Sequence, residues 1–301
     1  MTNRERRAEA PLSSARREPS GPARPGTSSI ERSSTLSSVL ARRRAADAAA
    51  RGLLEEADES PEAMPHRVTG EIGFILHAWD WSETSLLLDV LTPHYGRVFI
   101  VAKGARRHYS QFRGLLTAFC PLKFTWSGKK EAKVLSRVEW QGSMMPLSGD
   151  AMLSAFYVNE LILKLTERED RHPGLFALYV ETLHQLALGE ADRVQPALRK
   201  FERGILDATG WSPALTGAEK ADFFAVREGA LVGLAPRETP FEGETLYARA
   251  VAESVVNNEM KAPYWREARD ILRSLLDFHL DGRDIHTRRI LNELRELRTK
   301  A

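Results

Sequence analysis

The chain contains a single cysteine, Cys120, among its 301 residues. One thiol can form neither an intramolecular disulfide nor a cysteine-rich zinc site, so the fold must rest on packing, as expected in a reducing cytosol. Long apolar runs are also missing. None approaches the ~20 residues that cross a bilayer, and the N-terminus carries no apolar core of the signal-peptide kind. We therefore expect a cytoplasmic protein that is neither exported nor inserted in a membrane.

Signatures of catalysis are equally scarce. The sequence has no G-x-x-x-x-G-K-[ST] loop, which leaves ATP hydrolysis without support. Two aspartates and two histidines lie close together near the C-terminus, but His279 falls on an apolar helix face, where a core histidine is the commoner case. Cys120 has an apolar context and no obvious activating partner, which favours a buried thiol over a nucleophile. We predict no catalytic residue, no metal site and no cofactor.

The net charge of +2 is nearly balanced, but the residue types are unevenly distributed along the chain. Residues 1–66 are dominated by Ser, Arg, Ala, Pro and Gly. They have few large apolar side chains to offset the entropy of ordering, so we expect a disordered tail. The hydrophobic content of 43% supports real cores in the remainder. We divide that remainder into residues 67–145, with strand patterns, and residues 146–301, with mainly helical patterns.

Five short extended segments fall within residues 67–145. The last two alternate apolar and polar residues with the period of two that is typical of a half-buried strand, as in Leu122, Phe124 and Trp126. Five short strands over about 75 residues favour a small closed or nearly closed barrel of the OB type. The predicted strands are residues 68–79, 85–91, 97–102, 122–127 and 133–140.

The stretch from Arg97 to Arg113 combines positive charge with aromatic rings. It holds five cations and no carboxylate, and Tyr109 and Phe112 lie among them. Cations neutralise phosphates and release counterions, while flat rings offer a surface on which unpaired bases stack. Residues 67–140 as a whole carry eleven cations and six anions, and such a local basic field steers polyanions. We predict a DNA-binding site formed by Arg97, Lys103, Arg106, Arg107, Tyr109, Phe112, Arg113, Lys129, Lys130 and Lys133.

Several of these residues have a second interpretation. Phe112 is equally well explained as a core anchor that closes its loop. Lysines at a strand tip, such as Lys129, are also a common guard against edge pairing. The tryptophans of this region, Trp79, Trp81 and Trp126, are interpreted as barrel core rather than as a base platform.

The pattern turns helical after Pro146. Residues 150–168 carry one narrow polar stripe on an otherwise apolar helix, which is typical of a largely buried helix. Residues 223–234 contain two apolar runs around a turn and predict a β-hairpin. The other predicted helices are residues 175–188, 194–209, 243–257, a helix from Pro263 onward, and residues 286–297. The predicted fold class is α+β: an N-terminal five-stranded OB-fold barrel followed by a mainly helical domain with an inserted β-hairpin lacking zinc cysteines.

The β region also carries a series of spaced motifs. They are Trp81–Asp89, Thr92–Arg97, Val101–Arg107, Phe112–Leu116 and Leu122–Trp126. Together and in this order, they resemble the N-terminal domain of the RecO family of bacterial recombination mediators. The helical remainder resembles the family more loosely, through its size, the central hairpin and a segment near the end, and residues 1–66 have no match.

The resemblance implies a protein of the bacterial nucleoid that binds single- and double-stranded DNA, anneals complementary strands and helps to load the recombinase RecA. It also implies contact with RecR and with the acidic, apolar-ended tail of the single-stranded-DNA-binding protein. In many members four cysteines in the hairpin region hold zinc, but residues 222–236 contain none here, so we expect the hairpin to stand on packing alone. An acidic tail needs an apolar slot rimmed by cations, for which the candidates are Lys164, Arg168 and Arg171, or Arg199, Lys200 and Arg203.

Two other functions remain open. One is an OB-fold RNA-binding module, and the other is a protein scaffold whose basic residues serve solubility. For a DNA mediator, contacts to phosphate make binding nearly blind to sequence and steeply dependent on salt. We expect Arg106→Ala together with Arg107→Ala to weaken DNA binding and to flatten its salt dependence.

Overall fold

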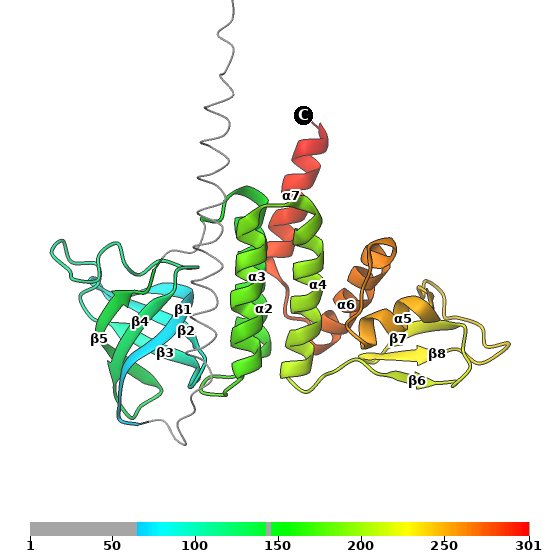
Figure 1. Ribbon diagram of the computed structural model, residues 1–301, viewed down its shortest axis with the longest axis horizontal. Coiled ribbons are helices and arrows are strands. Elements are labelled where there is room, and N and C mark those ends of the chain that lie inside the picture. The colour runs from blue at the N-terminus through cyan, green and yellow to red at the C-terminus, as the bar shows by residue number, and fades with distance from the viewer. Residues whose placement is uncertain (1–64, 143–145, 301) are drawn as a thin grey trace, which may run out of the picture. The chain divides into compact units, whose positions relative to one another are not determined.

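The computed structural model describes residues 65–142 and 146–300, so the predicted tail and the predicted boundary near residue 145 lie largely outside the described residues. The first described part is a closed barrel with strand order β1-β2-β3-β5-β4, in which only the β3–β5 pair is parallel (Figure 1). The predicted five-stranded OB-type barrel is confirmed. Its strands are β1 (Arg67–Trp81), β2 (Ser85–Thr92), β3 (Gly96–Ala102), β4 (Leu122–Ser127) and β5 (Ala132–Trp140).

The core of the barrel is formed by the alternate residues of each strand that face inward. In β3, Val98, Ile100 and Ala102 are fully buried while the residues between them are half-exposed. Trp126 of β4 is also fully buried in this core, as its interpretation from the sequence predicted. Burying one large apolar side chain contributes roughly 1.5–3 kcal/mol to the free energy of folding. The packing of this core therefore stabilises the barrel without a disulfide.

Strand β1 serves two cores because its outer face is also apolar over part of its length. Ile75 points into the barrel, whereas Ile72, Phe74 and Leu76 pack into the core of the helical part. The Phe74 ring lies 5.3 Å from the ring of Tyr179 in an edge contact. The pairing of β1 with β2 shifts after Ile75, and this bulge re-aims the last third of the strand.

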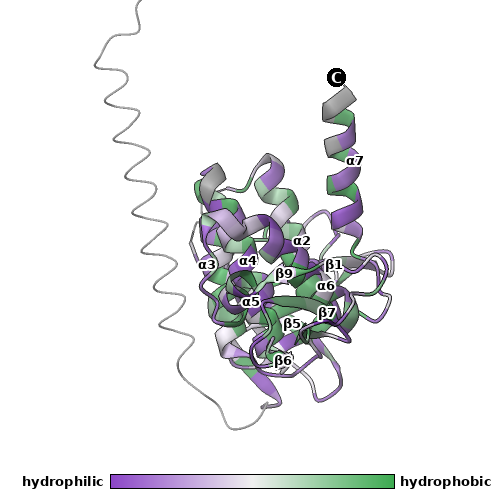
Figure 2. Cartoon of the chain, turned by 90° about the vertical axis from the view of Figure 1, so that its right-hand side faces the viewer, coloured by the Kyte–Doolittle hydropathy of each residue, from purple (hydrophilic) through white to green (hydrophobic). Residues whose placement is uncertain are grey.

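The helical part packs its elements around a second core. One helix, from Trp265 to His279, buries a single face made of Ala268, Ile271, Leu272, Leu275 and Leu276. Figure 2 shows hydrophilic and hydrophobic residues following one another along the last helix. The helices are α2 (Gly149–Leu165), α3 (Pro173–Leu188), α4 (Ala191–Ala208), α5 (Arg249–Val256), η1 (Ala262–Tyr264), α6 (Trp265–His279) and α7 (His286–Lys300).

A small second sheet accompanies these helices. The predicted hairpin is confirmed as β7 and β8, but it is joined by two short strands that the sequence did not predict. The predicted helix over residues 243–257 begins only at Arg249, because Tyr247 and Ala248 pair with β7 instead. The sheet has the order β6-β8-β7-β9, with β6 (Leu215–Gly217), β7 (Phe223–Arg227), β8 (Ala230–Gly233) and β9 (Tyr247–Ala248).

Barrel and helices meet through close backbone contacts. Gly96 has a φ of +64°, and a Cβ atom built there would lie 2.0 Å from the carbonyl oxygen of Asp170. The backbone N–H of Glu169 donates to the carbonyl of Arg97 over 2.9 Å. The buried Asn159 of α2 donates from Nδ2 to the carbonyl of Leu76 over 2.9 Å. Only glycine satisfies both the left-handed φ and the close approach at residue 96.

Candidate nucleic-acid interface

The segment between β3 and β4 is a loop made of consecutive tight turns. Backbone N–H groups of Arg107, Ser110 and Arg113 each donate to the carbonyl three residues earlier, all over 3.1 Å. The loop is tied to the turn between β1 and β2, since the N–H of Arg106 donates to the carbonyl of Thr84 over 2.9 Å. The predicted basic stretch therefore has a defined backbone conformation.

Two buried apolar side chains anchor this loop to the barrel core. Ala105 and Phe112 are each 6% exposed and belong to the barrel core. The structure thus decides between the two interpretations of Phe112: its ring fills the core and is not presented to solvent for base stacking. Phe112 therefore anchors the loop to the barrel core.

The charged side chains of the loop, and Tyr109 with them, are exposed. Lys103 and Arg107 are exposed and have no ion-pair partner within residues 65–142 and 146–300. Arg106 pairs with Asp80 over 3.0 Å, with both side chains well exposed, and such surface pairs are worth about 0–1 kcal/mol. Arg113 donates to the carbonyl of His108 over 3.1 Å. Tyr109 is 94% exposed.

The loop between β4 and β5 presents two further cations. Lys129 and Lys130 are exposed, and neither has an ion-pair partner in the described part of the chain. Lys133 differs, because its side chain is 4% exposed and its Nζ lies 2.7 Å from Glu169 and 2.9 Å from the carbonyl of Lys130. Because Lys133 is buried and paired, its ammonium group is not exposed to solvent as those of Lys129 and Lys130 are.

Arg97 is likewise held inside the fold. Its side chain is 11% exposed, pairs with Asp89 over 3.1 Å and donates to the carbonyl of Thr166 over 2.7 Å. Burial raises the pKa of Asp89, although Arg97 and Arg168 oppose the rise. Burial also lowers the pKa of Arg97 against the opposing charge of Asp89. Arg97 therefore links the barrel to the helical part, and its guanidinium is not free on the surface.

The candidate tail-binding cations are mostly engaged with neighbouring groups. Lys164 pairs with Glu160 over 3.2 Å, and the buried Arg199 pairs with Glu202 over 2.6 Å. The buried Arg203 donates to the carbonyls of Val255 and Val256. Arg171 is half-buried at the barrel–helix junction, where its charge acts on Glu71, and Arg168 packs its guanidinium 3.7 Å from the centre of the Phe99 ring.

Lys200 is the candidate that reaches an apolar groove. Its side chain is 50% exposed and pairs with Glu181 over 2.8 Å. The groove lies between α3 and α4, has a volume of about 240 Å³ and is mainly apolar. Its lining comprises Glu181, Thr182, Gln185, Arg193, Pro196, Ala197 and Lys200.

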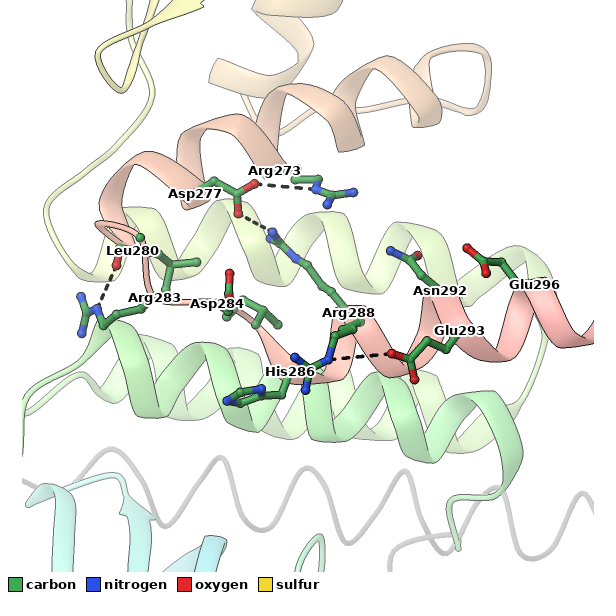
Figure 3. A pocket seen from close by; sticks show the side chains of 13 residues that line it. Arg273, Asp277, Leu280, Arg283, Asp284, His286, Arg288, Asn292, Glu293 and Glu296 are labelled. Atoms are coloured by element: carbon green, nitrogen blue, oxygen red, sulfur yellow. Dashed lines mark hydrogen bonds and ion pairs between the residues drawn. The ribbon is translucent and has the colours of Figure 1, made fainter.

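A larger cleft of about 440 Å³ lies beside α7 and is lined mostly by charged side chains (Figure 3). Its cations are largely neutralised within the cleft. Arg273 lies 3.7 Å from Asp277, which also pairs with Arg288, and Arg289 lies 3.9 Å from Glu293. This balance of charge does not single the cleft out as an anion site.

Sequence reasoning missed two exposed aromatic residues at the end of β1. Trp79 and Trp81 are 39% and 53% exposed, although both were interpreted as core. Alternate residues of a strand share a face, so the spacing of the two tryptophans was an available signal. What the sequence does not show is where the helices stop covering that face.

Two family models match this chain, one over the barrel and one over the helical part. Residues 67–144 match the family model described as recombination protein O N terminal, and residues 146–289 match recombination protein O C terminal. The chain belongs to the RecO family. A DNA repair protein RecO of Cupriavidus pinatubonensis is 40% identical over 84% of this chain and 89% of its own length. The RecO of Laribacter hongkongensis is 39% identical over 78% of this chain and 98% of its own length.

Ion pairs fasten the segment that follows the hairpin. The guanidinium of Arg227 at the end of β7 donates from Nε and Nη2 to both carboxylate oxygens of Glu244, over 2.6 and 2.8 Å. Its Nη1 donates to Glu238 over 2.7 Å. Arg227 therefore fastens residues 235–246 to the hairpin, which in this chain contains no cysteine, as the sequence predicted.

Proposed function

We propose that this RecO-family chain is a DNA repair and recombination mediator that binds single- and double-stranded DNA and anneals complementary strands. The observation that carries the proposal is the set of exposed cations on two barrel loops that have no carboxylate partner in the described residues: Lys103, Arg107, Lys129 and Lys130. The names of its relatives, DNA repair protein RecO, support the same assignment.

The mechanism we propose is electrostatic and breaks no covalent bond. Cations on the loops neutralise backbone phosphates and release their counterions. Neutralising two strands on one surface lowers their mutual repulsion, so base pairing proceeds between them. Because phosphate contacts carry no base information, binding is nearly blind to sequence. Arg106 joins the set by exchanging its exposed Asp80 partner for a phosphate.

The proposed partners are RecR, the single-stranded-DNA-binding protein and, indirectly, the recombinase RecA. For the acidic tail of the single-stranded-DNA-binding protein we propose the apolar groove between α3 and α4, with Lys200 and Arg193 at its rim. The groove supplies contact for an apolar end, and Lys200 can exchange Glu181 for a tail carboxylate.

We also propose that the protein acts in the cytoplasm, at the nucleoid. In the described part of the chain, no helix combines the length and apolarity needed to cross a bilayer. The DNA that a repair mediator serves lies in that compartment.

The test is an annealing assay on complementary strands coated with the single-stranded-DNA-binding protein, either intact or lacking its acidic tail. We expect faster annealing on both bare and coated strands, and a loss of the effect on coated strands when the tail is removed. Lys200→Glu should reproduce that loss while leaving annealing of bare strands unchanged, and Lys220→Glu, an exposed lysine elsewhere, is the matched control.

Other outcomes would contradict the proposal. Feeble, non-saturating retention of DNA at low salt would favour a protein scaffold. Tighter binding of RNA than of single-stranded DNA of equal length would favour an RNA-binding module.

A further inference from the structure

The outer face of β1 is divided into a covered and an uncovered part. The helices pack over Phe74 and Leu76. Their covering of β1 ends at Leu76, where Asn159 donates to the backbone carbonyl. Beyond the bulge, Trp79 and Trp81 continue the strand with 39% and 53% of their surfaces exposed. The fold thus leaves two tryptophan side chains on an open sheet face.

The neighbours of Trp79 extend this face across the sheet. Trp79 is paired with Leu87 of β2, which is paired with Val101 of β3, which is paired with Val134 of β5. Each of the three partners is half-exposed. Residues directly opposite one another in a sheet share a face, so this row is a strip of apolar surface four strands wide.

An aromatic ring and an exposed cation lie at the two sides of the strip. On one side the Trp79 ring lies 6.0 Å from the ring of Phe99, on which the guanidinium of Arg168 is stacked. Arg168 is itself paired with Glu131 and lies 3.6 Å from Asp89, so its charge is largely neutralised. On the other side the strand alternation continues from Val101 to the exposed Lys103. Aromatic surface next to an exposed cation suits unpaired bases that stack while a neighbouring phosphate is neutralised.

We infer that this face is a base-stacking platform for single-stranded DNA, with Trp81 and Trp79 as its stacking residues. The inference rests on the proposed DNA-binding function and adds to it a contact with the bases themselves. Stacking is open to any base because every base has a π-face. Bases inside a duplex are already stacked on each other, so the platform favours unpaired strands over duplex.

The test compares two oligonucleotides of equal length, one of thymidines and one with abasic sites, which carries the same phosphates but no rings. We measure the dissociation constant of each for the full chain, for Trp81→Ala, and for Trp140→Ala as a matched control. Trp140 is 60% exposed at the far end of β5, opposite Leu122. The full chain should bind the thymidine strand roughly ten-fold tighter than the abasic strand, given the usual worth of stacked bases.

Trp81→Ala should remove most of that difference while leaving the affinity for the abasic strand and its salt dependence unchanged, and Trp140→Ala should leave both affinities unchanged. Trp81→Phe keeps a ring and should retain most of the preference, which separates an effect on stacking from an effect on folding. Equal binding of the two strands by the full chain would overturn the platform and leave phosphate binding intact. Binding of neither strand would instead contradict the proposed function.

Discussion

Phe112→Ala tests how the basic loop between β3 and β4 is held. The side chain is 6% exposed and lies in the barrel core beside Ala105. Truncating a buried phenylalanine costs about 3–5 kcal/mol, through the transfer free energy of the removed atoms and the cavity left behind. The turns that present Lys103 and Arg107 close over this ring, so we expect both stability and DNA affinity to fall.

Two controls make the result specific. Phe112→Leu keeps most of the apolar volume and should cost less than about 1.5 kcal/mol. Tyr109→Ala changes a side chain that is 94% exposed and should shift stability by no more than about 0.5 kcal/mol. The assay is chemical denaturation followed by DNA binding under conditions in which each variant is folded. A destabilisation below about 1 kcal/mol for Phe112→Ala would refute the anchoring role, since a buried ring should cost several-fold more.

Three further changes probe the helical part and its junction with the barrel. Burial alone would raise the pKa of Glu160, but hydrogen bonds from the backbone of Thr287 and His286 hold it below its usual 4.5. The stabilisation by Glu160 is therefore present above that value and is lost as pH falls through the lowered pKa. Acid titration of stability in Glu160→Gln should lack this component, and an unchanged profile would contradict the stabilising role of the hydrogen bonds from His286 and Thr287 to Glu160. Gly96→Ala should strongly lower the melting temperature, because the added Cβ meets the carbonyl of Asp170; a wild-type melting temperature would contradict this. Arg227→Ala should release residues 235–246 to limited proteolysis, whereas Arg227→Lys should only partly protect them, and equal resistance in all three proteins would argue against the clamp.

The barrel was predictable because its information is local. Alternation in Leu122, Phe124 and Trp126, and the apolar run after Arg97, report strands without reference to the rest of the chain. The hairpin was predictable for the same reason. The short strand β9 was not, because Tyr247 and Ala248 are extended only through their pairing with Phe224 and Phe223.

The candidate site was harder to predict, because accessibility depends on distant residues. Lys133 and Arg107 look alike in the sequence, yet Lys133 is buried against Glu169 and Arg107 is exposed. Arg97 is drawn inward by Asp89 and by a carbonyl 69 residues away. Trp79 is exposed only because the helical cover ends at Leu76. Such facts follow from tertiary packing and not from the spacing of residues.

The central claim is that unpaired cations on the barrel loops bind phosphate. It is tested most directly by the slope of log affinity against log salt concentration for a single-stranded oligonucleotide. Lys103→Ala with Arg107→Ala should reduce the magnitude of this slope by about 1.4, at about 0.7 for each phosphate that is no longer neutralised. Lys220→Ala with Arg266→Ala, two exposed cations elsewhere, should leave the slope unchanged. A folded Lys103/Arg107 variant with the wild-type slope would contradict the claim.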